Sequence, residues 1–207
     1  FPRRYRAKAQ EIIYRGGRAE AVAISGNERI PCDAVVLASA GGALPLISGT
    51  GFRAPLTSLT GFTLTLELSD SEALPALTVA SPEKGFILAR LDRRLRATGR
   101  FFLGSPAEKE KKAECNRLYD AVMGSFENLR SNTVASQFWS GEFLASPDRF
   151  PLAGPVPGAD NVILNIAHGP FGLAGAGESA EIAAASALGE DPGEFAAFCS
   201  PGRFAEK

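Results

Sequence analysis

Residues 161–189 read NVILNIAHGPFGLAGAGESAEIAAASALG, an apolar strand that passes through a glycine-rich turn into an alanine-rich helix. Glycines remove side chains where a backbone must approach a ligand closely, and four lie in this turn: Gly169, Gly172, Gly175 and Gly177. The helix is expected to begin near Gly177 or Glu178, where its first N–H groups have no partner inside the helix. The stretch therefore predicts a cradle for an electron-rich cofactor.

Residues 175–180, GAGESA, match the G-x-G-x-x-G/A pattern of dinucleotide-binding turns. In such a turn the first glycine follows its strand directly, whereas eight residues separate Ile166 from Gly175 here. The pattern also needs a second strand that ends in an acidic residue about 20 positions on, and 191–193 read DPG instead. We therefore do not interpret this match as a Rossmann fingerprint.

Several further motifs lie on both sides of this stretch. Trp139-Ser140-Gly141 precedes PDRFPLAGP at 147–155, and AHGPFGL occupies 167–173. Upstream are DAVVLASAG at 33–41, PL at 55–56, GFTLT at 61–65 and LRATG at 95–99. In this order the motifs resemble those of the D-amino acid oxidase and glycine oxidase superfamily of FAD-dependent oxidoreductases. The motifs at 55–65 and 95–99 are most similar to its D-amino acid dehydrogenase branch.

The resemblance implies a mixed fold, α+β or α/β, in two parts. One is part of a FAD-binding Rossmann-like domain, expected at 1–50 and 146–207. The other is an antiparallel-sheet substrate domain with a flanking helix, expected at 51–145. The family carries its own GxGxxG at the N-terminus, and no such motif precedes position 33 here. We therefore expect the chain to be the C-terminal portion of a longer protein, with the N-terminal FAD-binding segment as its partner.

The chemistry that the resemblance implies is hydride removal from an amine-bearing carbon to FAD, which leaves an imine that water hydrolyses. The flavin performs that redox step, so no catalytic side chain is identified. The resemblance places Gly169, Gly172 and Leu173 beside the flavin ring. It leaves two roles open for His168, a flavin contact or an ordinary hydrogen bond at a strand end. Ser39, Ala40 and Gly41 are expected beside the ribityl or phosphate groups, with an ordinary strand-exit turn as the alternative.

Substrate recognition is where the sequence departs from the family pattern. The pattern W-x-G-x-R-P has an arginine two residues after the glycine, which suits bidentate pairing with a carboxylate. Phe143 occupies that position and Leu144 replaces the proline. A free α-amino acid is therefore in doubt unless an arginine enters from neighbouring strands; the candidates are Arg90, Arg96 and Arg100. The expected substrate-binding residues are Gly141, Phe143 and Arg96.

Trp139 shares a strand face with Gly141 and Phe143, and core packing is its expected role, while Glu142 should face the opposite side. Two alternative functions stay open. Residues 148–152, DRFPL, are similar to a run in flavin oxidase domains that act on a modified tRNA base. A non-catalytic remnant or binding module of the same fold would also explain Phe143.

Composition is that of a globular protein, with 45% apolar residues and a net charge of −1. So small a net charge offers no electrostatic footprint for nucleic acid, which is not an expected partner. No apolar run approaches the ~20 residues that span a bilayer. The cysteines are widely spaced and odd in number, so they are interpreted as reduced thiols, and a cytoplasmic protein is expected. Three widely spaced cysteines and a single histidine supply no metal-ligand set, so no metal site is expected.

Alternating apolar residues and turn signals predict most of the strands. They are expected at 10–14, 19–25, 27–30, 34–38, 62–68, 85–90, 94–103 and 134–143. Ser105-Pro106-Ala107-Glu108 is interpreted as a capping box with proline at the first helical position. Apolar residues at helical spacing follow it, namely Leu118, Val122, Phe126 and Leu129.

Overall fold

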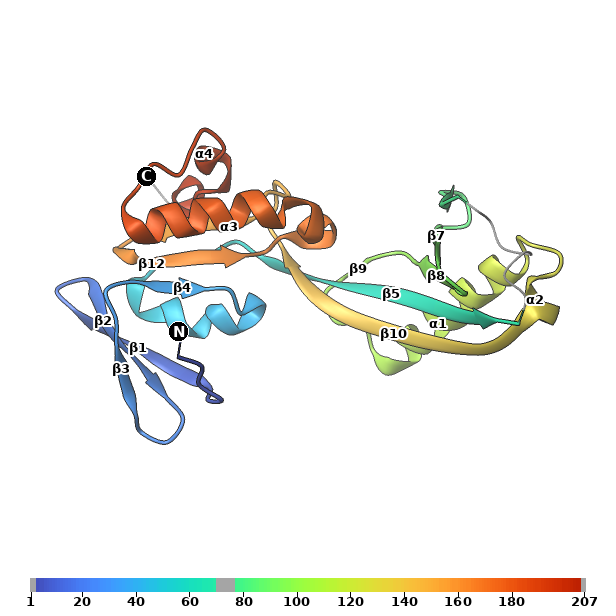
Figure 1. The fold of residues 1–207 in the computed structure, drawn as a ribbon, viewed down its shortest axis with the longest axis horizontal. Coiled ribbons are helices and arrows are strands. Elements are labelled where there is room, and N and C mark those ends of the chain that lie inside the picture. Colours follow the sequence, from blue (N-terminus) through green and yellow to red (C-terminus); the bar gives the residue numbers. More distant parts are fainter. Residues whose placement is uncertain (1–2, 70–76, 206–207) are drawn as a thin grey trace. The chain divides into compact units, whose positions relative to one another are not determined.

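A computed structural model of the chain describes residues 3–69 and 77–205. The chain divides into two compact units, Phe1–Thr57 with Phe143–Lys207, and Ser58–Glu142. The domain boundaries expected from the sequence lie between residues 50 and 51 and between residues 145 and 146. Each unit combines helices with strands (Figure 1), in agreement with the mixed fold predicted from the sequence.

The first unit is built around strand β12 (Ala159–Ile166). It pairs antiparallel with β11 (Leu152–Val156) and parallel with β4 (Val35–Leu37). Helix α3 (Gly172–Leu188) packs on β11 and β12 (Figure 1). Because β12 is covered on both faces, five of its eight residues are buried apolar ones rather than an alternating set.

A second sheet of the same unit has the order β1-β2-β3. Its strands are β1 (Ala9–Arg15), β2 (Arg18–Ile24) and β3 (Arg29–Pro31), so the predicted hairpin is confirmed. Both central residues of its turn, Gly16 and Gly17, have positive φ, as a tight hairpin with matching twist requires. Short helices complete the unit: η1 (Ala40–Ala43), η2 (Pro45–Thr50), η3 (Gly169–Phe171), α4 (Ala196–Cys199) and η4 (Pro201–Phe204).

The second unit holds a sheet of order β10-β5-β8-β7-β6, with β9 paired to β5. Its strands are β5 (Thr57–Leu68), β6 (Val79–Ser81), β7 (Phe86–Leu91), β8 (Arg94–Thr98), β9 (Phe102–Leu103) and β10 (Thr133–Ala145). The predicted buried face of β5 is confirmed, since Phe62, Leu64 and Leu66 are at most 1% exposed. They form a core with Leu118 and Val122 of helix α1 (Glu108–Met123), and α2 (Leu129–Asn132) precedes β10.

The predicted capping box at Ser105 is wrong. Helix α1 begins at Glu108, Ala107 takes the N-cap position, and the Glu110 carboxylate accepts a hydrogen bond of 2.8 Å from the Ala107 N–H. The Ser105 hydroxyl instead donates to Glu142 of β10, which also accepts from Ser58 at 2.9 Å. The Ser105 side chain therefore binds the Glu142 carboxylate of β10 instead of capping the helix as the local sequence had predicted.

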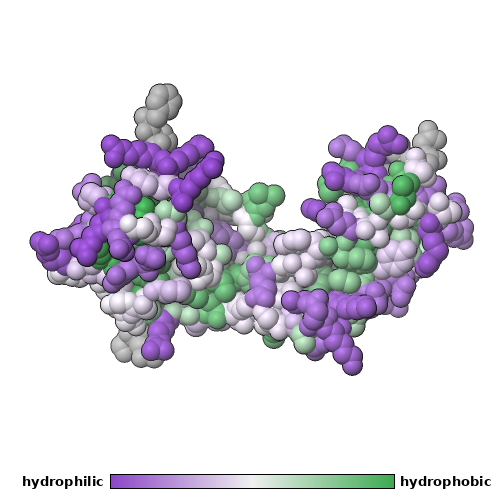
Figure 2. All heavy atoms as spheres, turned by 90° about the horizontal axis from the view of Figure 1, so that it is seen from below, coloured by the Kyte–Doolittle hydropathy of each residue, from purple (hydrophilic) through white to green (hydrophobic). Residues whose placement is uncertain are grey.

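Core packing of Trp139 is also wrong, because its side chain is 61% exposed. Its ring lies over the backbone of Gly141, where an added Cβ would come within 2.1 Å of it. Residues 134–140 of β10 are all exposed, so alternation along this strand does not separate a core face from a solvent face. Apolar side chains reach the surface of both units (green in Figure 2).

Candidate functional site

A pocket of about 430 Å³ lies in the first unit, where β4 and β12 end and α3 begins. The two strands are parallel neighbours, with Leu37 opposite Leu164, so their carboxyl ends open at the same edge of the sheet. That edge is where open α/β sheets bind ligands. The lining residues are Ala38, Ala40, Phe143, Leu144, Asn165, Ile166, Ala167, His168, Gly169, Gly172, Leu173, Ala176 and Ser179.

The backbone around the pocket adopts conformations that L-residues seldom take. Ala40 has a φ of 48° and Ala167 a φ of 61°, and Gly169 follows with 62°. For alanine the left-handed region costs about 1 kcal/mol or more, and such strain is concentrated at functional sites. The strain and the small side chains together indicate a site where the main chain itself contacts a ligand.

Helix α3 begins at Gly172 rather than near Gly177 or Glu178, so the expected start is wrong by about a turn and a half. The short helix η3, which has Pro170 at its second position, leads directly into α3, and no side chain caps the junction at Phe171. Gly175 and Gly177 therefore lie within the helix, so GAGESA does not form a strand-to-helix turn. The first N–H groups of α3 lie at the pocket, since Gly172 and Leu173 line it.

His168 is held by two polar side chains of the pocket. Its Nε2 lies 3.0 Å from Asn165 Oδ1 and 2.9 Å from Ser179 Oγ. The Ser179 hydroxyl also donates to the Ala176 carbonyl at 3.2 Å. Burial lowers the pKa of His168, which favours a neutral ring at physiological pH. The hydrogen-bonded role predicted for this histidine is confirmed, and its contact with a flavin stays a prediction.

None of the residues that line the pocket carries a side chain that is charged at neutral pH once His168 is neutral. Phe143 is among them, at the position where the family pattern has arginine. The pocket can therefore offer apolar contacts, backbone donors and acceptors, and the three linked polar side chains. It offers no cation for a carboxylate from its own lining.

The structure brings six of the ten predicted site residues to this pocket: Ala40, Phe143, His168, Gly169, Gly172 and Leu173. Ser39 and Gly41 flank Ala40 at the start of η1 but do not line it. Gly141 and Arg96 belong to the second unit, where Arg96 Nε donates a long hydrogen bond of 3.4 Å to Thr65.

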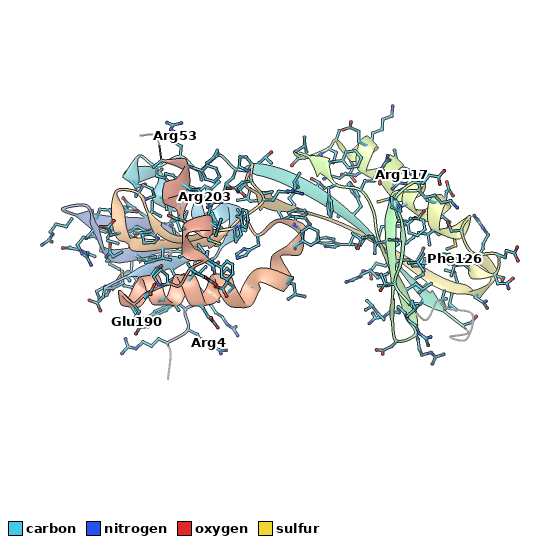
Figure 3. The ribbon with its side chains drawn as sticks, turned by 90° about the horizontal axis from the view of Figure 1, so that it is seen from above. Arg4, Arg53, Arg117, Phe126, Glu190 and Arg203 are labelled. Carbon is cyan, nitrogen blue, oxygen red and sulfur yellow. The ribbon has the colours of Figure 1, made fainter. Side chains whose placement is uncertain are left out.

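The other two arginine candidates have partners in the second unit. Arg90 donates to the carbonyl of Asp92 at 3.1 Å. Arg100 pairs at 2.8 Å with Glu114, a carboxylate that is only 3% exposed. Glu114 also accepts from Arg117 (Figure 3) at 2.6 and 2.8 Å. Arg100 thus pairs with a buried carboxylate beside the core, although its own side chain is 54% exposed.

Asn165 and Ser179 are the site residues that sequence reasoning missed. Each carried a signal, although a weak one. Asn165 is the only polar residue in the run from Val162 to Ile166, and a polar residue in a buried strand needs a partner. Ser179 is the first hydroxyl of the α3 sequence, and it is 2% exposed.

The described residues hold no group of three or more His, Cys, Asp or Glu side chains that could bind a metal ion. Cys32, Cys115 and Cys199 are free thiols. Over 3–69 and 77–205, no helix has the length and apolar character needed to cross a membrane.

Comparison with known proteins gives one family and many relatives. The model of the FAD dependent oxidoreductase family (DAO) matches residues 4–186. A D-amino acid dehydrogenase of Xanthobacter autotrophicus is 28% identical over 203 residues, which is 98% of this chain and 48% of the relative. A D-amino acid dehydrogenase of Sinorhizobium medicae is 28% identical over 180 residues, 87% of this chain and 42% of the relative. The chain thus spans about half the length of these relatives.

Solved structures share the fold at lower identity. Glycine oxidase from Geobacillus kaustophilus superposes with a TM-score of 0.80 at 17% identity, covering 97% of this chain and 53% of that one. L-amino acid deaminase from Proteus vulgaris gives 0.76 at 20% identity, covering 96% and 49%. These likenesses confirm the fold class.

The pocket residues fit part of a flavin. A planar ring system that is partly apolar and carries carbonyl oxygens needs flat apolar walls and N–H donors. Phe143, Leu144 and Ile166 supply the first, and the uncapped start of α3 supplies the second. The glycine and alanine positions let the backbone approach such a ring closely.

Proposed function

The chain belongs to the FAD dependent oxidoreductase family, and we propose that it oxidises an amine or amino acid in the manner of a D-amino acid dehydrogenase. Bound FAD would supply the hydride acceptor of that reaction. The observation that carries the proposal is the pocket at the end of β12, where strained backbone and the start of α3 meet. The similarity to two D-amino acid dehydrogenases supports the choice of branch.

The proposed cofactor contacts come mainly from the main chain. Gly169, Gly172 and Leu173 would lie against the ring, and the N–H groups that begin α3 would stabilise negative charge that develops on it. His168 would add a side-chain contact. Ser39, Ala40 and Gly41 would hold the ribityl or phosphate part, as the turn after β4 lies at the same edge of the sheet.

The proposed substrate is an amine with apolar substituents. Phe143 gives the pocket an aromatic wall at the position where a cation would bind a carboxylate, and this supports an apolar group near the reacting carbon. If a carboxylate binds, Arg96 is the proposed partner, because the only hydrogen bond of its side chain among the described residues is the long one to Thr65. Gly141 is the third residue proposed to bind the substrate.

The activity of the whole relatives is a proposal for this chain, because it spans about half their length. We propose that the ADP part of FAD is held by a strand–turn–helix segment with a GxGxxG motif that lies outside residues 1–207. The protein to be tested is accordingly the longest natural polypeptide that contains this sequence.

The test is the absorption spectrum of that polypeptide, purified without added ligand and again after incubation with FAD. Under anaerobic conditions we would add D-amino acids, the matching L-amino acids and the matching decarboxylated amines. Bleaching of the flavin bands by D-amino acids or amines is the expected result. If the polypeptide does not retain flavin even after FAD is supplied, the proposed oxidoreductase activity is ruled out and the non-catalytic alternative is left.

A further inference from the structure

His168 is fixed between a strand and a helix. Asn165 belongs to β12, Ser179 belongs to α3 and is 2% exposed, and the histidine main chain forms a bridge with Ala145. Gly172 packs so closely that an added Cβ would lie 2.8 Å from the Cβ of His168. The ring therefore has little freedom to rotate away from its two partners.

The two partners of Nε2 are both acceptors in this arrangement. An amide oxygen has lone pairs and no proton, so Asn165 Oδ1 can only accept. The Ser179 hydroxyl donates its proton to Ala176, which leaves oxygen lone pairs for the ring. A ring nitrogen that faces two acceptors must carry the proton. The opposite tautomer would need a rotated Asn165 amide and a Ser179 hydroxyl turned away from Ala176.

The second ring nitrogen is then an acceptor. A neutral imidazole has one proton, so Nδ1 of an Nε2–H tautomer carries a lone pair. Among the described residues no side chain or N–H donates to His168 Nδ1, while His168 lines the pocket. Among the described residues, Tyr14 Oη is the only buried side-chain N or O atom without a partner, so Nδ1 is open to solvent, and a bound ligand would donate a hydrogen bond there in place of water.

We propose that Asn165 and Ser179 are positioning residues that hold His168 as the Nε2–H tautomer, so that Nδ1 accepts a hydrogen bond from an O–H or N–H group of the bound ligand. The tautomer follows from the protein alone, and the ligand contact rests on the proposed function. The pocket is thereby specific for a hydrogen-bond donor at this point rather than for an anion.

The tautomer can be read directly because His168 is the only histidine. Long-range ¹H–¹⁵N spectra of protein labelled with ¹⁵N-histidine distinguish a protonated from an unprotonated ring nitrogen. At a pH above the titration of the ring, a protonated Nε2 and a pyridine-type Nδ1 are expected. A protonated Nδ1 in the unaltered protein overturns the inference, whatever the variants do.

The variants Ser179→Ala and Asn165→Ala test the positioning role. Each should change the spectrum towards a mixture of tautomers, because one acceptor is lost. Ser186→Ala is the matched control, since Ser186 lies two turns further along α3 and does not line the pocket. Circular dichroism shows whether each variant folds. If both variants fold and the tautomer of His168 is unchanged in each, a positioning role for Asn165 and Ser179 is ruled out.

The ligand contact is tested by titrating FAD, and then an unreactive substrate analogue, into the longest natural polypeptide. The Nδ1 resonance should move upfield with one of them, and Ser179→Ala should bind that ligand about fivefold more weakly, the usual worth of one hydrogen bond. If FAD does not bind at all, the proposed function fails while the tautomer result stands. If both ligands bind without moving Nδ1, the contact is disproved while the proposed function stands.

Discussion

Gly172 and His168 approach so closely that a Cβ at position 172 would lie 2.8 Å from the Cβ of the histidine. This contact joins the start of α3 to the N-cap of η3, where the pocket has its only histidine. The atom that would clash is bonded to the main chain, so it cannot move as the tip of a flexible side chain can. Glycine at 172 is therefore required by a close approach and not by its φ of −53°.

Replacing Gly172 with alanine should move His168 away from Asn165 and Ser179. We expect overpacking to lower the free energy of unfolding by about 1 to 3 kcal/mol, which exceeds the gain of up to ~1 kcal/mol from the higher helix propensity of alanine. Gly177→Ala is the matched control, because nothing lies within 4 Å of an added Cβ there. Urea unfolding should show the control to be as stable as the unaltered protein or more so. Equal effects of the two substitutions would show that the contact at 172 does not constrain the fold.

Phe143→Arg should give the pocket the cation that its lining lacks. A guanidinium can pair with a substrate carboxylate in a bidentate manner, and charge-assisted hydrogen bonds contribute about 1.5 to 3 kcal/mol. We expect at least a tenfold rise in kcat/KM for an amino acid relative to its decarboxylated amine, measured by anaerobic flavin bleaching. Phe143→Leu, which removes the ring without adding charge, should leave that ratio unchanged. A ratio unaltered by arginine would mean that position 143 does not meet the substrate.

Elements with a regular apolar pattern could be predicted from the sequence. The hairpin of β1 and β2 and the buried face of β5 depend on local signals, glycines in the turn and strict alternation. The start of α3 could not be placed, because its glycines indicated a turn. In the structure, the alanine-rich segment and Pro170 extend the helical conformation through Gly175 and Gly177.

The polar network of the site could not be predicted because it joins residues that approach only in the folded chain. Asn165 and Ser179 are 14 positions apart in sequence, and both meet one ring nitrogen of His168. For Trp139, alternation identified which residues share a face but not whether that face is covered. Phe143 does line the pocket, and a motif had defined its spacing from Gly141, while its contact with a substrate stays a prediction.

Asp148 and Arg203 fasten the C-terminal helix η4 to the turn before β11. Arg203 (Figure 3) donates from Nε to Asp148 Oδ2 at 2.7 Å and from Nη2 to Oδ1 at 3.1 Å. The hydrogen bonds from Arg203, with smaller contributions from Ser146 and the Phe150 N–H, lower the pKa of Asp148 to about 2. A carboxyl group whose pKa is lower in the folded state stabilises the fold above its unfolded pKa.

This contribution should be present above about pH 4 and should disappear as the pH falls towards 2. Because the Asp148 side chain is 35% exposed, solvent screening reduces the contribution of its ion pair to the free energy of unfolding to about 1 kcal/mol. Urea unfolding of the unaltered protein and of Asp148→Asn should therefore differ at pH 6 and converge near pH 2. A difference that persists at pH 2 would assign the effect to the new amide N–H group that faces Arg203 Nε rather than to the loss of charge.

Asn161 joins β12 to two other segments through one buried amide. Its Oδ1 accepts from the Ala19 N–H at 2.9 Å, and its Nδ2 donates to the carbonyls of Ala19 and Asp33 at 2.8 Å each. The side chain is 7% exposed, so water cannot replace these bonds. Asparagine is the only residue of this shape that supplies both an acceptor and two donors.

Asn161→Asp keeps the shape and removes both donors, so an ionised carboxylate would face two carbonyl oxygens. We expect a loss of at least 2 kcal/mol at pH 7, since buried acceptors are left unpaired next to a buried charge. Protonation restores one donor, so the pKa of the new carboxyl group is raised in the folded state. The loss of stability caused by Asn161→Asp should consequently be smallest below about pH 4 and should grow as the pH rises. Asn161→Ala carries no titratable group, and its loss relative to the unaltered protein should be the same at pH 4 and pH 7. Parallel pH dependence of the two variants in urea unfolding would show that position 161 is not buried against those carbonyls.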